Sequence, residues 1–267
     1  MFLTRSSNCS PTLNIMITAV QKAARGIIRD FGEIEHLQVL KKGLGDFVSS
    51  ADKKSEKIIM EELEKGRPGY SFLAEESGTI SGKDKQFTWI IDPLDGTTNF
   101  LHNIPHFAIT VALKKDCEII AGITYDPIKD EMFWAEKGKG AFMNQRRLRV
   151  SARTQLDEAL IAIGTPFGNH GDHNIFQKHL EKIMPITAGT RRLGAAALDL
   201  AYVASGRFDG FFENNLKPWD LAAGVLLVKE AGGYVSEING SKNMLETGSV
   251  LASNQDLFSP LQAILQS

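Results

Sequence analysis

The run of strand-like segments between Phe107 and Val150 constrains the fold more than any other feature of this sequence. Five short segments follow one another there: FAITVAL, EIIAGITYD, EMFWAEK, GAFMN and LRVS. Turn signals such as Lys-Asp, Asp-Pro and Gly-Lys-Gly separate them. Strands joined by such short turns pair with their neighbours in antiparallel fashion, so the pattern predicts an antiparallel meander within one sheet.

Helix and strand patterns alternate in the rest of the chain. Apolar residues at helical spacing predict an amphipathic core helix over about residues 13–31, and a second helix is expected over about residues 52–65. Gly43 and Gly45 predict a mobile loop between these helices, and residues 77–86 are predicted to form a surface loop. After residue 151, strands are expected at 160–165, 186–191, 208–214, 233–238 and 249–254, and helices near 173–184, 195–205, 219–231 and 258–266. This order predicts two fused α/β halves rather than a uniform barrel.

The composition argues against several classes of protein. The net charge of −2 gives no basic face for nucleic acid. Two cysteines in 267 residues form neither a disulfide framework nor a zinc-ligand pattern, which is typical of a reducing cytoplasm. The apolar run LNIMITAV is short and continues in helical register, so it predicts part of the first helix rather than a signal peptide. No segment approaches the roughly 20 apolar residues of a membrane span, and residues 1–11 are expected to form a flexible lead-in.

The stretch WIIDPLDGTTNF, residues 89–100, carries the first candidate site. Its apolar start predicts a buried strand, and Asp92 and Asp95 follow where that strand is expected to end. Pro93 stiffens the turn, so that both carboxylates and the Leu94 carbonyl can converge on one point. Oxygen ligands of this kind suit Mg²⁺, whereas an isolated Asp-x-x-Asp is more often a hydrogen-bonded turn.

Three further features accompany this stretch. Gly96 and Thr97 begin a predicted helix, whose first amides could bind an anion beside the metal. Asp220 begins the apolar helix of PWDLAAG, where an acid is most often an N-cap. Glu75 ends a short strand, where an acid is most often solvated. Four acids at the ends of core elements form a better candidate for one shared site than any pair, and a metal site beside an anion site indicates phosphate ester chemistry.

These motifs resemble the two signatures of the inositol monophosphatase family, within the lithium-sensitive, Mg²⁺-dependent phosphatases. WIIDPLDGTTNF and PWDLAAG carry the resemblance, and GDFVSSAD at 45–52, EES at 75–77 and GAAALDLAYVASGRFDGFFE at 194–213 extend it over about residues 13–260. The chain is most similar to the bacterial inositol-1-monophosphatases. The resemblance implies an α/β fold, a five-layer αβαβα sandwich that usually forms a homodimer. Its two halves are expected at 12–150, with the DPLDGTT motif, and 151–267, with WDLAAG.

The resemblance also implies roles for individual residues. The metal ligands would be Glu75, Asp92, the Leu94 carbonyl, Asp95 and Asp220, which would hold two or three Mg²⁺ ions. Glu75 and Thr97 would position the attacking water, and Asp52 would orient Thr97. Substrate contacts would come from Asp95, Gly96, Thr97, Gly194, Ala195, Ala196, Glu213 and Asp220. Ala195 stands where many relatives carry Ser or Thr, which removes one hydroxyl from the part of the site that selects the alcohol.

The expected activity is Mg²⁺-dependent hydrolysis of inositol monophosphate to myo-inositol and phosphate, with inhibition by Li⁺. No Ser or Cys nucleophile paired with a His is evident in the sequence, so direct attack by water is favoured over a phospho-enzyme. His102 and His106 are interpreted as lying near the site without a proton-transfer role. The alternatives are a related phosphatase acting on fructose 1,6-bisphosphate, NADP or a 3′-phosphoadenylate, and a non-enzymatic partner of the transcription machinery.

Overall fold

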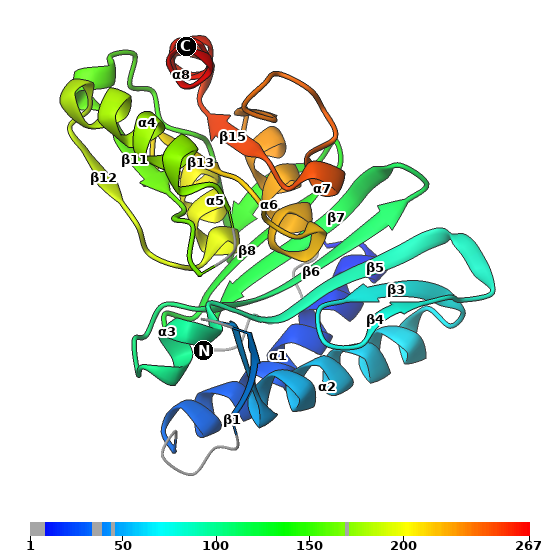
Figure 1. The fold of residues 1–267 in the computed structure, drawn as a ribbon. Helices are drawn as coiled ribbons and strands as arrows, with labels where there is room; N and C mark the ends of the chain where they lie inside the picture. The colour runs from blue at the N-terminus through cyan, green and yellow to red at the C-terminus, as the bar shows by residue number, and fades with distance from the viewer. Residues whose placement is uncertain (1–8, 34–38, 44–45, 169–170) are drawn as a thin grey trace.

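The computed structural model stacks the chain in five layers, in the order helix, sheet, helix, sheet, helix (Figure 1). It describes residues 9–33, 39–43, 46–168 and 171–267. Four apolar clusters of the described residues fill the spaces between the layers. The layered αβαβα arrangement expected from the sequence is therefore confirmed.

The first layer consists of α1 (Pro11–Phe31) and α2 (Ser50–Gly66), which pack together and cover one face of the first sheet. Ser10 caps α1, since its side-chain oxygen accepts a hydrogen bond from the Leu13 amide at 3.1 Å. Most of the apolar face predicted for α1 is buried, from Leu13 to Ile27, while Ile17 and Phe31 are half-buried against the same core. Both helices thus form where the sequence predicts them, because each places one apolar face on the core.

Two segments predicted as loops contain strands instead. β1 (Val39–Gly43) and β2 (Asp46–Ser49) pair as an antiparallel hairpin between the first two helices, and Gly45 lies outside the described residues. β4 (Gly78–Ile80) pairs with β3 (Tyr70–Ala74) where a surface loop was predicted. These short strands are formed by hydrogen bonds between backbone groups. Such pairing does not require an apolar pattern, so the sequence carries no signal that predicts them.

The first sheet has eight strands in the order β10-β9-β8-β7-β6-β5-β3-β4. The predicted meander is confirmed for its first four segments, because neighbours from β5 to β9 are antiparallel, whereas β3 runs parallel to β5. The strand predicted at LRVS, residues 148–151, is wrong, since the last strand of the meander is β10 at Arg146–Arg147 and residues 148–151 are in no strand. Its remaining strands are β5 (Asp84–Asp95), β6 (Ala108–Lys115), β7 (Glu118–Asp126), β8 (Glu131–Glu136), β9 (Gly140–Met143) and β10 (Arg146–Arg147). β5 continues beyond Asp92 to Asp95, and its pairing with β6 is irregular between these two residues.

The middle layer consists of α5 (Ala196–Ala204) and α6 (Pro218–Glu230), which lie between the two sheets (Figure 1). All of α5 and most of α6 are buried, as expected of helices covered on both sides. Gly122 of β7 allows α6 to approach the first sheet closely, because a Cβ there would lie 2.9 Å from the Ala223 Cα. This close packing brings the start of α6 to the sheet that carries Asp92 and Asp95.

The second sheet has five strands in the order β12-β11-β13-β15-β14, and α4 and α8 pack on its outer face. The strands are β11 (Leu160–Ile163), β12 (Gly189–Arg191), β13 (Gly210–Glu213), β14 (Tyr234–Ser236) and β15 (Val250–Ser253). The outer helices are α4 (His173–Ile183) and α8 (Gln255–Gln266), and the short helices are α3 (Thr97–Leu101), α7 (Met244–Thr247), η2 (Leu156–Glu158) and η3 (Met184–Ile186). Each strand lies inside a segment predicted from the sequence.

The predicted division of the chain at residue 150 stays a prediction. The middle helices α5 and α6 follow that residue, yet α6 packs on the first sheet as well as beside the second. The lead-in predicted for residues 1–11 falls largely on residues 1–8, which lie outside the described residues, and α1 already includes Pro11. Throughout the described ranges, no helix combines the length and the apolar character that crossing a membrane requires.

Candidate metal centre and substrate cleft

Three carboxylates from distant parts of the chain meet at the end of β5. Asp92, Asp95 and Asp220 each offer an oxygen atom, and these atoms lie within 4.8 Å of one another. Asp92 is 2% exposed and Asp95 9%. Because α6 packs closely on the first sheet, Asp220 lies beside Asp92 and Asp95 although it is far from them in the sequence. The two signature motifs therefore contribute to one cluster.

Each of these carboxylates accepts a hydrogen bond from a backbone amide. The Leu94 amide donates to Asp92 Oδ1 at 2.9 Å, because the irregularity after Asp92 turns the chain back on that side chain. The Ala197 amide donates to Asp95 Oδ2 at 2.8 Å, so Asp95 caps the start of α5. The Lys217 amide donates to Asp220 Oδ2 at 2.7 Å. One oxygen of each side chain is thereby oriented by the backbone.

Glu75 lies next to Asp92 because of the register between two parallel strands. Ala74 of β3 pairs with Ile91 of β5, and the Glu75 amide donates to the Ile91 carbonyl at 3.2 Å. Glu75 and Asp92 are the residues that follow this pair, so their side chains emerge at the same edge of the sheet. The structure therefore brings Glu75 to the same cluster as the three aspartates.

The electrostatics of the cluster favour a bound cation. Burial raises the pKa of Asp92 well above its ordinary value, and the neighbouring Glu75, Asp95 and Asp220 raise it further. Burial and the charge of Asp220 raise the pKa of Asp95 in the same way, and burial raises the pKa of Asp220 to about 6. Buried carboxylates that repel one another are stabilised as anions by a divalent cation, and oxygen ligands of this type fit Mg²⁺.

Thr97 lies beside this cluster at the start of α3. Its hydroxyl is 3.2 Å from Asp52 Oδ1 and 3.1 Å from the Leu94 carbonyl oxygen, and it can donate to either. Asp52 is fully buried on α2. Gly96, the N-cap, has a φ of 92°, and a Cβ there would lie 3.1 Å from the His106 carbonyl oxygen. Only glycine adopts this conformation readily in so tight a space, which fixes where Thr97 begins its helix.

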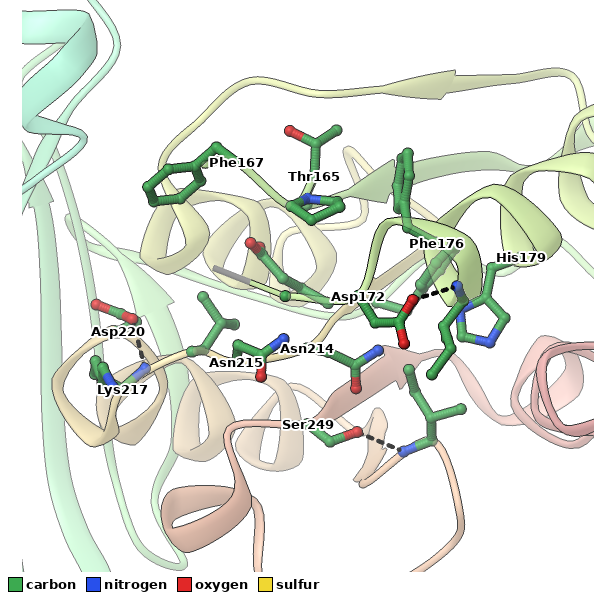
Figure 2. A pocket seen from close by; sticks show the side chains of 18 of the residues that line it. Thr165, Phe167, Asp172, Phe176, His179, Asn214, Asn215, Lys217, Asp220 and Ser249 are labelled. Carbon is green, nitrogen blue, oxygen red and sulfur yellow. Dashed lines mark hydrogen bonds between the residues drawn. The ribbon is translucent and has the colours of Figure 1, made fainter. Parts of the chain in front are cut away.

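A cleft of about 1060 Å³ extends from the cluster toward α4 (Figure 2). Glu75, Glu213 and Asp220 line it at the metal end, and Figure 2 shows Asn214 and Asn215 lying between Asp220 and the far end, where His179 projects from α4. The described residues that line it are otherwise Gly164, Thr165, Pro166, Phe167, Gly171, Asp172, Ile175, Phe176, Phe212, Leu216, Lys217, Trp219, Ile238, Asn239 and Ser249. Its size exceeds that of a single sugar phosphate, so an alcohol ring has room beside the metal end.

Glu213 occupies a space that Gly164 leaves open. A Cβ at residue 164 would lie 1.7 Å from the Glu213 Cδ, so any other residue would displace this carboxyl group. Burial raises the pKa of Glu213 to about 8, assisted by the charge of Asp220 and opposed by Arg192. Residues 194–196, also predicted to contact the substrate, are not among the described residues that line this cleft. Ala195 packs near Gly96, beside the Asp95 carboxylate. Contact of any of these residues with a substrate stays a prediction.

Asp199 and His106 have buried polar atoms near the site. In the sequence analysis, Asp199 had no role and His106 had no proton-transfer role. Among the described residues, Asp199 Oδ1 and His106 Nε2 are buried without a hydrogen-bond partner. Burial raises the pKa of Asp199, with contributions from Glu213 and Asp95, and its signal in the sequence is a single acid within the apolar helix AALDLAYVA. Burial and the charge of Lys129 lower the pKa of His106 to about 4, so this imidazole is neutral at neutral pH.

Comparisons with known proteins agree on one family. A model of the inositol monophosphatase family matches residues 8–266. An inositol-1-monophosphatase from Caulobacter vibrioides is 56% identical over 245 residues, which cover 91% of this chain and 96% of that protein. A Nus factor SuhB from Escherichia coli is 43% identical over 244 residues, 91% of either chain.

The solved structures lead to the same family. The crystal structure of the extragenic suppressor protein suhB from Bartonella henselae is 49% identical in sequence, with a TM-score of 0.94 over 97% of this chain and 99% of that chain. The family model also matches nearly the whole chain, so sequence and structure agree on the family. The protein belongs to the inositol monophosphatase family.

Proposed function

We propose that the protein is a phosphatase that hydrolyses inositol monophosphate to myo-inositol and phosphate in a Mg²⁺-dependent reaction. The observation that carries this proposal is the cluster of Asp92, Asp95 and Asp220, whose oxygen atoms lie within 4.8 Å of one another. Glu75 and the Leu94 carbonyl would complete the ligands for two or three ions. The relatives named inositol-1-monophosphatase, at 51–56% identity, support inositol monophosphate as the substrate.

Bound Mg²⁺ would neutralise the phosphate and lower the pKa of the attacking water. The residues of the chain would then orient the reactants. The Thr97 hydroxyl directs its proton to Asp52 Oδ1 or to the Leu94 carbonyl, both of which are acceptors. Its oxygen lone pairs are therefore available to accept a hydrogen bond from a water on the cleft side. Together with Glu75, Thr97 would hold that water in line with the bond to be broken.

Replacement of a metal ligand tests the proposal directly. Asp95→Asn keeps the shape of the side chain but removes its charge, so phosphate release from inositol 1-phosphate should fall by about 1000-fold or more. Asp157→Asn, which changes an exposed acid of η2, is the matched control and should retain activity. Near-normal activity of the correctly folded Asp95→Asn protein would disprove the site assignment.

The choice among related substrates depends on the cleft beyond the metal cluster. We assign it to the surroundings of Glu213, which lines the cleft and whose carboxyl group can bind a sugar hydroxyl. A panel of inositol 1-phosphate, fructose 1,6-bisphosphate, NADP and a 3′-phosphoadenylate, assayed with and without Mg²⁺ and Li⁺, distinguishes the candidates. Inhibition by Li⁺, a homodimer and a cytoplasmic location are further predictions of the proposal.

A second function is favoured by the names of other relatives. Proteins called Nus factor SuhB are 42–43% identical to this chain. We infer a role as a protein partner of the transcription machinery, one that does not require catalysis. Co-purification with RNA polymerase that persists in the Asp95→Asn protein would support this role, and its absence from both proteins would refute it.

A further inference from the structure

We propose that Glu56 is a positioning residue for the metal site, because it fixes the peptide segment that directly follows Glu75. The proposal rests on the proposed function, in which Glu75 is a ligand for Mg²⁺. Glu56 lies on α2 and is 2% exposed, so its carboxyl group lies inside the protein rather than in solvent. It would act through Glu75, without touching the substrate or the metal itself.

The contacts of Glu56 are with the two residues that follow Glu75. Its Oε2 accepts a hydrogen bond from the Glu76 amide at 2.8 Å, and its Oε1 accepts one from the Ser77 hydroxyl at 2.5 Å. Both carboxyl oxygens are thus engaged by one turn of the chain. Burial of a carboxylate is costly unless hydrogen bonds compensate for its lost hydration, so the position of this turn is strongly coupled to Glu56.

Glu75 is consequently held on both sides. On its N-terminal side, β3 pairs with β5, and the Glu75 amide donates to the Ile91 carbonyl at 3.2 Å. On its C-terminal side, the Glu56 carboxylate binds Glu76 and Ser77. A metal ligand whose backbone is fixed at both flanks loses little conformational entropy when the ion binds, which increases the affinity for the ion.

The same face of α2 also holds the other parts of the metal site. Asp52, Ser55 and Glu56 are spaced i, i+3 and i+4, so they lie on one side of the helix. The Ser55 hydroxyl donates to the Pro93 carbonyl at 2.9 Å, inside the irregular end of β5, and Asp52 contacts Thr97. One buried polar face of α2 therefore contacts three segments that carry candidate catalytic groups, and Glu56 contacts the Glu75 segment.

The test compares Mg²⁺ binding by Glu56→Gln with that of the natural protein. A glutamine has one acceptor oxygen in place of two, so it cannot accept hydrogen bonds from both the Glu76 amide and the Ser77 hydroxyl, and the charge that strengthens these bonds is removed. Isothermal titration calorimetry should show a rise of about 10-fold in the dissociation constant for Mg²⁺, the effect typical of groups that orient metal ligands. The Mg²⁺ concentration for half-maximal phosphate release should rise in parallel, while the KM for inositol 1-phosphate at saturating Mg²⁺ changes less than twofold.

Two further variants separate positioning from general stability. Glu61→Gln makes the same charge change at an exposed site on the same helix and should bind Mg²⁺ as the natural protein does. Ser77→Ala removes one donor from an exposed residue and should raise the dissociation constant about threefold, so it tests the proposal even where Glu56→Gln fails to fold.

The outcomes distinguish this proposal from the proposed function. Unchanged Mg²⁺ binding in Glu56→Gln and Ser77→Ala, in a protein whose natural form binds Mg²⁺, would overturn the positioning role alone. A lowered melting temperature without a change in Mg²⁺ affinity would do the same, since it indicates a purely structural residue. If the natural protein neither binds nor requires Mg²⁺, the proposed function fails, and this proposal fails with it.

Discussion

The two ends of the cleft are built differently. At the metal end, Asp92, Asp95 and Asp220 lie on a strand and at a helix start, and each accepts a backbone hydrogen bond of 2.7–2.9 Å. Beyond it, the cleft is lined largely by residues of connecting segments, such as Thr165, Asn239 and Ser249, and by residues of α4 such as His179 (Figure 2). Regular elements thus carry the candidate metal ligands, and connecting segments line most of the space in which the proposed substrate would place its alcohol.

This difference separates the chemistry of the reaction from the choice of substrate. Loops tolerate changes of sequence better than packed elements do. The residues at the far end can therefore change without loss of the proposed hydrolysis. Changes at the metal end should reduce the rate with every substrate. Changes at the far end should alter only the preference among substrates.

Loss of the Thr97 hydroxyl should produce the largest effect of the three predicted below. Thr97→Val keeps the shape of the side chain but removes the hydrogen bond to Asp52 and the oxygen that holds the water. We expect kcat to fall about 100-fold with any phosphate monoester, the lower range for loss of a group that assists proton transfer. Steady-state assays with inositol 1-phosphate and p-nitrophenyl phosphate measure this effect.

The conservative change Thr97→Ser is its control. Serine retains the hydroxyl, so the kcat of this variant should lie within a few-fold of the natural value. A loss in Thr97→Ser equal to that in Thr97→Val would mean that packing of the methyl group, rather than the hydroxyl, determines the rate. A loss seen with only one substrate would contradict the separation between the two ends.

Glu213→Gln should have a smaller and more selective effect. Glu213 is half-buried, packs against Gly164 and lines the cleft beside Asp220. Weakening one hydrogen bond to a ring hydroxyl should raise the KM for inositol 1-phosphate about 10-fold, equivalent to roughly 1.4 kcal/mol. The KM for p-nitrophenyl phosphate, which carries no ring hydroxyl, should stay within twofold. Equal changes for both substrates would place Glu213 in the reaction rather than in substrate selection.

The sequence predicts the metal end better than it predicts its support. Asp92 and Asp95 lie three residues apart after an apolar strand, and Asp220 starts an apolar helix, so local patterns locate all three. The alternation of strand and helix signals predicts two fused α/β halves, whereas the five layers were expected only from the family resemblance. Local patterns do not predict the hairpin of β1 and β2 or the edge strand β4. These strands are formed by backbone pairing and carry no apolar spacing.

The residues that contact the candidate site from other segments could not be predicted from the sequence for a further reason. Glu56 and Ser55 resemble the polar residues of any solvated helix face, and only the tertiary structure shows that their partners are Glu76, Ser77 and Pro93. Likewise, the fit of Glu213 against Gly164 joins residues from β13 and from the end of β11, which no local pattern connects. Interactions between segments far apart in the chain therefore set the limit of sequence prediction here.

The smallest effect concerns stability, and its sign should depend on Mg²⁺ for a proposed metal ligand but not for Glu213. The folded-state pKa values of Asp92 and Asp95 are raised by burial and mutual repulsion, that of Asp220 to about 6 and that of Glu213 to about 8. The folded protein therefore binds more protons than the unfolded chain does. Between about pH 4 and pH 8 its metal-free stability should fall as the pH rises.

Asp92→Asn removes one of the repelling charges at the metal end. In EDTA at pH 8 it should raise the melting temperature by a few degrees, about 1 kcal/mol of unfolding free energy. With saturating Mg²⁺ it should lower the melting temperature below that of the natural protein, because stabilisation by the bound ion is lost. Glu213→Gln should raise it under both conditions, since Glu213 is not a proposed ligand. Calorimetry of the three proteins measures these shifts, and a sign reversal in Glu213→Gln as well would remove the distinction between the metal ligands and Glu213.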